Sequence, residues 1–138
     1  MRDILFRGKD IETGKWHLGQ YIHLHKTSYC FEGEGNNDNN IHQIVFERMT
    51  DWGLPNEYFR ADVDPETVGE YTGIKDTTGK WIFEGDIVVN DLSQMHDALS
   101  NKPRVVRFMN GRWTYICDKG RKVKIIGNIH DNPELLNK

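Results

Sequence analysis

The chain has no long apolar run. No stretch of its 138 residues approaches the roughly 20 consecutive apolar residues of a membrane-spanning helix. The first seven residues mix charged and apolar side chains, which is unlike a secretory signal. We therefore expect a cytoplasmic protein with no membrane partner.

Cysteine is scarce. The chain contains only Cys30 and Cys117, and their separation matches no zinc or dithiol redox motif. The expectation is two free thiols in a reducing cytoplasm, with one long-range disulfide as the alternative.

Motifs for covalent catalysis and phosphate binding are missing as well. The candidate nucleophiles stand in no nucleophile elbow and in no glycine-flanked turn of a covalent active site. They are Ser93, Ser100, Cys30 and Cys117. Residues 32–35 include two glycines, but the segment has no lysine and hydroxyl partner, and its two glutamates would repel phosphate. We expect no enzymatic activity and no cofactor.

The chain does contain many short apolar runs separated by Gly, Asn and Asp turns, and no long amphipathic helix. This pattern is typical of a small barrel or sandwich, so the predicted class is all-β. Strands are predicted over residues 3–7, 15–24, 41–47, 67–74, 81–83, 87–89, 104–109, 112–117 and 122–129. Residues 67–138 would form an SH3-type barrel with a short carboxy-terminal helical turn, and residues 1–66 an additional amino-terminal β lobe packed on the barrel.

Three stretches are predicted to be irregular. Residues 27–40 are rich in Gly and Asn and have no apolar periodicity, which makes them a candidate binding loop. Residues 52–59 are predicted to be irregular, with a short helical turn after Pro55. For residues 90–103, a helix of one or two turns and a simple loop both remain open.

The most informative stretch runs from residue 68 to residue 89. Asp76 and Gly79 bound a tight turn in which the aspartate accepts a hydrogen bond from the backbone two residues on. Residues 84–86 form a second turn or bulge that redirects the chain into another strand. Asp76, Glu84 and Asp86 could also form a carboxylate cluster for metal binding or acid–base chemistry. Turn chemistry is preferred, because each acid stands beside a glycine or begins a turn.

The first of these turns has an echo. Residues 13–16 repeat residues 78–81 letter for letter, and a Lys-Asp pair precedes each copy. Either a hairpin was duplicated or one good hairpin sequence is used twice. The second interpretation is preferred because the echo is short.

Histidines offer a candidate metal site. His23 and His25 lie two residues apart and therefore share a strand face, and His17 could join them. No cysteine or carboxylate completes a ligand set, so we interpret the histidines as an exposed strand face and predict no metal site.

Charge is unevenly spread. Residues 1–66 carry 7 Lys and Arg against 12 Asp and Glu, a net charge of −5, whereas residues 67–138 carry 11 against 9, a net charge of +2. Residues 100–125 hold eight bases and one acid, Asp118. On a regular strand Arg104 and Arg107 face opposite sides, so both could line one groove only if a bulge intervened.

Three separated segments resemble, in order, the motifs of the YopX family. They are residues 1–7, residues 71–76 with 79–80 and 84–88, and residues 126–136. No match is claimed for residues 25–60 and 90–102. The resemblance implies a phage or prophage origin in bacteria and an SH3-type barrel in the carboxy-terminal part. It implies no catalytic residues, because the family's function is unknown.

We therefore predict a non-catalytic binding protein of the bacterial cytoplasm that binds a host or phage protein and forms a homo-oligomer. The oligomer prediction rests on the opposite charges of the two halves and on the abundant aromatic residues. The alternative is nucleic-acid binding through the basic strands at 102–124. Its candidate residues are Arg104, Arg112, Lys119, Lys122 and Lys124.

Overall fold

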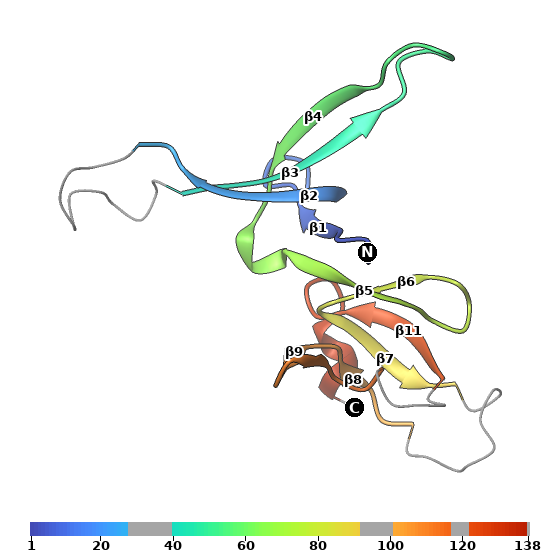
Figure 1. The fold of residues 1–138 in the computed structure, drawn as a ribbon. Coiled ribbons are helices and arrows are strands. Elements are labelled where there is room, and N and C mark those ends of the chain that lie inside the picture. Colours follow the sequence, from blue (N-terminus) through green and yellow to red (C-terminus); the bar gives the residue numbers. More distant parts are fainter. Residues whose placement is uncertain (28–39, 92–100, 117–121, 138) are drawn as a thin grey trace. The chain divides into compact units, whose positions relative to one another are not determined.

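A computed structural model describes residues 1–27, 40–91, 101–116 and 122–137 of the chain (Figure 1). Its strands form antiparallel sheets, which confirms the all-β class. In the described part of the chain these sheets are open, and no closed SH3-type barrel is seen. The chain divides into two compact units: Leu5–Val68, and Gly69–Lys138 together with Met1–Ile4. The predicted partition at residues 66 and 67 into a lobe and a barrel stays a prediction.

The amino-terminal unit is one antiparallel sheet in the order β4-β3-β2-β1. Its strands are β1 (Phe6–Lys9), β2 (Trp16–His25), β3 (Asn40–Arg48) and β4 (Glu57–Asp62). A short 3-10 helix, η2 (Pro65–Thr67), follows. The side chain of Asp64 caps η2 by accepting a hydrogen bond from the N–H of Glu66 at 3.0 Å.

Two expectations for this unit are wrong. The first strand begins at Phe6 instead of residue 3. Residues 57–59 belong to a strand, because β4 pairs with β3 and brings Phe59 opposite Phe46. The two rings lie 5.9 Å apart, a cross-strand aromatic contact that favours the sheet over irregular structure. The glycine and proline at 53 and 55 shape only the preceding turn. The predicted binding loop lies almost wholly outside the described residues.

The carboxy-terminal unit contains three antiparallel pairings. The hairpin of β5 (Gly69–Lys75) and β6 (Trp81–Phe83) contains the predicted turn. A three-stranded sheet has the order β11-β7-β8, with β7 (Asp86–Asn90), β8 (Arg104–Val105) and β11 (Val123–Asn128). The strands β9 (Phe108–Met109) and β10 (Arg112–Trp113) form a second hairpin, and η4 (Pro133–Asn137) is a 3-10 helix near the end.

The second hairpin is confirmed. Asn110 and Gly111 form its turn with φ angles of 53° and 76°. Both are positive, as the favoured two-residue hairpin turn requires.

The predicted continuous strand over residues 104–109 is wrong, because the chain breaks between β8 and β9. Val106 at the break is fully buried. Its N–H donates to the Asp86 carbonyl, and its carbonyl accepts from the N–H of Gly85. Val106 joins Ile82, Val88, Trp113, Ile116 and Val123 in the core of this unit. Burial of Val106 therefore overrides the regular alternation of side chains along the strand.

Candidate functional site

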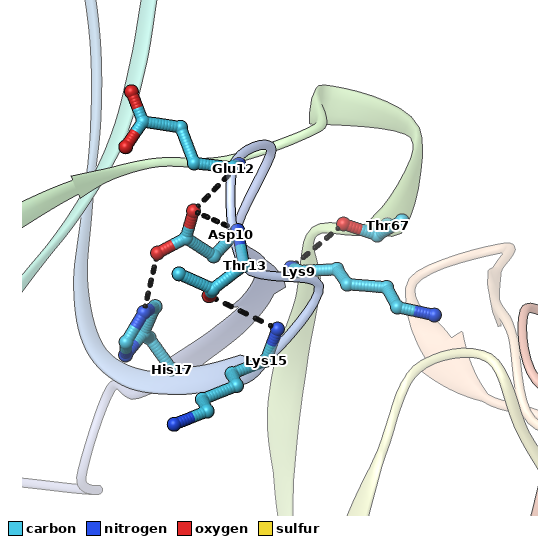
Figure 2. Close-up of polar contacts among 7 residues, drawn as sticks. All are labelled: Lys9, Asp10, Glu12, Thr13, Lys15, His17 and Thr67. Atoms are coloured by element: carbon cyan, nitrogen blue, oxygen red, sulfur yellow. Dashed lines mark hydrogen bonds and ion pairs between the residues drawn. The ribbon is translucent and has the colours of Figure 1, made fainter.

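The first candidate is the turn around Asp10 (Figure 2). One carboxylate oxygen of Asp10 accepts the N–H groups of Glu12 and Thr13 at 2.8 and 3.2 Å. The other lies 2.9 Å from Nε2 of His17. The hydrogen bond from His17, followed by those from Thr13 and Glu12, lowers the pKa of Asp10 to about 2. Such a carboxyl stays ionised at neutral pH, so it serves as an acceptor that orders the turn and not as a proton donor.

The turn around Asp76 has the same backbone pattern. The N–H of Asp76 donates to the Lys80 carbonyl at 2.8 Å, and the N–H of Gly79 donates back to the Asp76 carbonyl at 3.1 Å. In the first turn, Asp10 donates to Lys15 and receives from Gly14 at 2.8 and 2.9 Å. The repeated letters thus build one kind of turn twice. Whether this reflects duplication stays open.

The remaining acids of the suspected carboxylate cluster are also engaged in the fold. The buried carboxylate of Asp86 accepts the N–H of Phe83 at 2.8 Å. Burial and the charge of Glu70 raise the pKa of Glu84, while Arg107 opposes the rise. The preferred turn interpretation is confirmed for Asp76 and Asp86, whose oxygens bind backbone N–H groups.

The histidines lie in two groups. The rings of His23 and His42 stack with centroids 4.4 Å apart, the Tyr21 hydroxyl contacts Nδ1 of His42, and the ring of His25 lies 6.2 Å from that of His23. His17 instead stacks on Phe46, with centroids 4.7 Å apart. Within the described residues, no three His, Cys, Asp or Glu side chains are grouped so that they could hold a metal ion.

The predicted nucleic-acid residues do not gather on one face of the β11-β7-β8 sheet. Arg104 and Ile125 both lie opposite Val88, whereas Lys124 lies opposite Val89. Because neighbouring rows point to opposite faces, Lys124 projects away from the side of Arg104, and Lys122 shares its face. Arg112 is exposed on β10, and Lys119 lies outside the described residues.

Arg104 instead shares a surface hollow of about 320 Å³ with Lys102 and Arg107. We call it the Arg104 hollow. The strand break at Val106 is what lets both arginines line it, since on a continuous strand they would face opposite sides. Lys102 and Arg107 were missed as site residues by sequence reasoning. The signal that could have found them is the apolar pair Val105-Val106, which a break can place in the core.

A second open surface lies on the amino-terminal sheet. The register places six apolar side chains on one side: Leu18, Ile22, Leu24, Ile41, Val45 and Tyr58, which we call the Leu18 face. Leu18, Leu24 and Tyr58 are 50%, 58% and 78% exposed. By contrast, Ile44 and Val63 are the two buried hydrophobic side chains among the described residues of this unit.

Fold and surfaces together define an all-β protein of open antiparallel sheets, in which Asp10, Asp76 and Asp86 are engaged in turns. The chain belongs to the YopX family, a family of unknown function whose model matches residues 5–137, so the predicted membership is confirmed. The crystal structure of protein EF1440 from Enterococcus faecalis is similar in fold, with a TM-score of 0.52, 24% identity and 99% of each chain covered. No curated protein gives a significant match. No helix in the described ranges is long and apolar enough to span a membrane.

Proposed function

We propose that this YopX protein is a phage-encoded, non-catalytic binding protein of the bacterial cytoplasm that self-associates through its Leu18 face. The carboxylates that would first be suspected of catalysis support a binding role, because Asp10, Asp76 and Asp86 hold backbone groups in turns. A host or phage protein is the expected further partner, and a closed SH3-type barrel in the carboxy-terminal part remains part of the proposal.

The observation that carries the proposal is the thin core of the amino-terminal unit. A single sheet is stable only when one of its faces is covered by another layer. This unit buries Ile44 and Val63 but leaves leucines and a tyrosine of the Leu18 face open. Covering a leucine side chain fully is worth roughly 1.5–3 kcal/mol. Association is therefore the means by which such a sheet gains its missing hydrophobic contact.

The occupant of the Leu18 face is a second copy of this chain. The half of the chain that bears the face has a net charge of −5, and the other half has +2. The acidic half of one copy therefore attracts the basic half of another, and this attraction guides encounter between copies. It also makes the association weaker at high salt.

Replacing both Leu18 and Leu24 by lysine should convert the oligomer to a monomer. Loss of two apolar contacts, with two charges added, should raise the dissociation constant about a hundredfold or more. Light scattering on the purified protein over a wide concentration range measures the mass directly. The matched control is Leu54→Lys, which changes a leucine that is 59% exposed but lies outside the Leu18 face. A wild-type protein that stays monomeric at high concentration would remove self-association.

Nucleic-acid binding is the second candidate function, and it is favoured by the common exposed face of Lys122 and Lys124. Contacts of this kind are made with phosphates and weaken steeply as salt rises. Binding of a DNA or RNA oligonucleotide should therefore fall with salt and be lost in the variant Lys122→Glu with Lys124→Glu. Absence of any binding at low salt would exclude this function. A pull-down from infected host cells separates it from protein binding.

A further inference from the structure

The Arg104 hollow concentrates positive charge. Three cationic side chains line it, Lys102, Arg104 and Arg107, and none of its lining residues among those the structure describes is acidic. The acid whose charge Arg107 meets is Glu84, which does not line the hollow. Clustered like charges repel one another unless an anion lies between them. The hollow is therefore electrostatically suited to an anionic ligand.

Tyr115 gives the hollow a fixed shape. Its φ angle of 64° is in the left-handed region, where an aromatic residue is rare and strained. The guanidinium of Arg104 lies over its ring, 4.8 Å from the centroid. This contact restrains the planar fork of donors that Arg104 offers to a phosphate. A strained residue that positions a charged group is more typical of a binding site than of a simple turn.

Thr114 fixes the backbone that carries Arg107. Its hydroxyl accepts the N–H of Arg107 at 2.9 Å, and its own N–H donates to the Arg107 carbonyl at 2.8 Å. The same hydroxyl lies 3.3 Å from the Val105 carbonyl. The backbone of Arg107 is thus tied to the residue next to Tyr115, so two of the three cations are placed before any ligand arrives.

The rest of the lining is apolar. Met109 and Leu136 contribute exposed side chains, and Tyr115 is itself 37% exposed. Phosphate alone would need only the cations, whereas a flat apolar body can lie against the ring, the guanidinium and the thioether. The volume of about 320 Å³ is near the lower limit, roughly 300 Å³, of small-molecule sites.

We infer that the Arg104 hollow binds a nucleotide. Lys102, Arg104 and Arg107 hold its phosphate, and its base stacks on the Arg104–Tyr115 pair beside Met109. The ligand is either a free nucleotide or one nucleotide of a single strand, since both present the same phosphate and base. This site is separate from the Leu18 face and from the face of Lys122 and Lys124, so it does not depend on either proposed function.

Calorimetric titration at low salt tests the inference with three probes: adenosine 5′-monophosphate, inorganic phosphate and a single-stranded thymidine oligonucleotide. Both nucleotide-bearing probes should bind the full-length protein more tightly than inorganic phosphate. Tyr115→Gly should weaken nucleotide binding about tenfold or more without lowering the melting temperature, because glycine accepts the positive φ at no cost. Tyr115→Phe keeps the ring and should bind within about threefold of wild type. Arg107→Gln should weaken all three probes about tenfold.

Each outcome decides the inference. Tighter binding of the free nucleotide identifies a small-molecule site, and tighter binding per nucleotide of the oligonucleotide identifies a single strand; both support a nucleotide. Equal binding of phosphate and nucleotide would overturn it in favour of a simple anion site. Oligonucleotide binding that survives Tyr115→Gly and Arg107→Gln but is lost with Lys122→Glu and Lys124→Glu would also overturn it, and would support the second candidate function. Failure of all three probes at low salt would sink the inference, whatever the oligomeric state.

Discussion

Replacing Asp76 by asparagine should lower the free energy of unfolding by about 2–4 kcal/mol. One carboxylate oxygen of Asp76 accepts the N–H and hydroxyl of Thr78 at 2.9 and 2.7 Å and the N–H of Lys80 at 2.9 Å. The other accepts the N–H of Ile125 on β11 at 3.1 Å. Asparagine can replace only one of these oxygens. Its NH₂ group would face a backbone donor, leaving a buried N–H without an acceptor.

The same group makes stability depend on pH. Burial by itself raises the pKa of Asp76, but the hydrogen bonds from Thr78, Ile125 and Lys80 outweigh it and lower the pKa below 3.8. A lowered folded pKa means that the stabilisation is fully present above 3.8 and is lost as pH falls through the folded value. Acidification below about pH 4 should therefore destabilise wild type more than Asp76→Asn, which has no carboxyl to titrate.

Urea unfolding followed by tryptophan fluorescence at about pH 7 and about pH 3 measures both effects. Glu12→Gln is the control, because Glu12 is exposed and its replacement should change stability by less than about 0.5 kcal/mol. Wild-type stability in the Asp76→Asn variant at neutral pH would contradict the role assigned to this carboxylate.

Asp76 also shows where sequence reasoning succeeds and where it stops. The bonds to Thr78 and Lys80 lie within a few residues, so the order of aspartate, threonine and glycine was enough to predict the turn. The bond to Ile125 joins residues 49 apart. No local pattern encodes it, because it exists only once β11 is seated on β7.

The Arg104 hollow illustrates the same limit. Alternation correctly placed Arg104 and Arg107 on opposite sides of a regular strand, and a bulge was the stated exception. The exception occurs because Val106 enters the core, a tertiary effect that strand periodicity does not contain. The predicted set of basic residues was therefore split: Arg104 lies in the hollow, while Lys122 and Lys124 project from the other face.

Membership of the YopX family was predicted from the turn motifs for the same local reason. Those motifs are glycines, their partner acids and strand apolars, which determine a fold through neighbouring residues. Closure of the sheets is a property of strands far apart in sequence, and it is not seen in the described part of the chain. The strand β4 was missed because its pairing partner, β3, supplies what its own sequence lacks.

Replacing Gly19 by alanine should destabilise the amino-terminal unit by about 3 kcal/mol or more. A Cβ at this position would lie 2.0 Å from the Val45 carbonyl oxygen and 3.1 Å from Cγ2 of Ile44. The first of these atoms is backbone, so β2 and β3 would have to separate locally and give up ladder hydrogen bonds. Ile44 is one of the two buried hydrophobic side chains described in this unit, so the separation would also expose its core.

Gly14 provides the matched control, because it tests the other reason for a glycine. Its φ is +70° and nothing lies within 4 Å of the position that a Cβ would occupy, so Gly14→Ala should cost only about 1 kcal/mol of backbone strain. Amide hydrogen exchange locates the damage: Gly19→Ala should remove protection from β2 and β3 and leave β7 and β11 protected. Equal costs for the two alanine variants would contradict the argument, because close packing of β2 on β3, which Gly14 does not share, is what makes Gly19 irreplaceable.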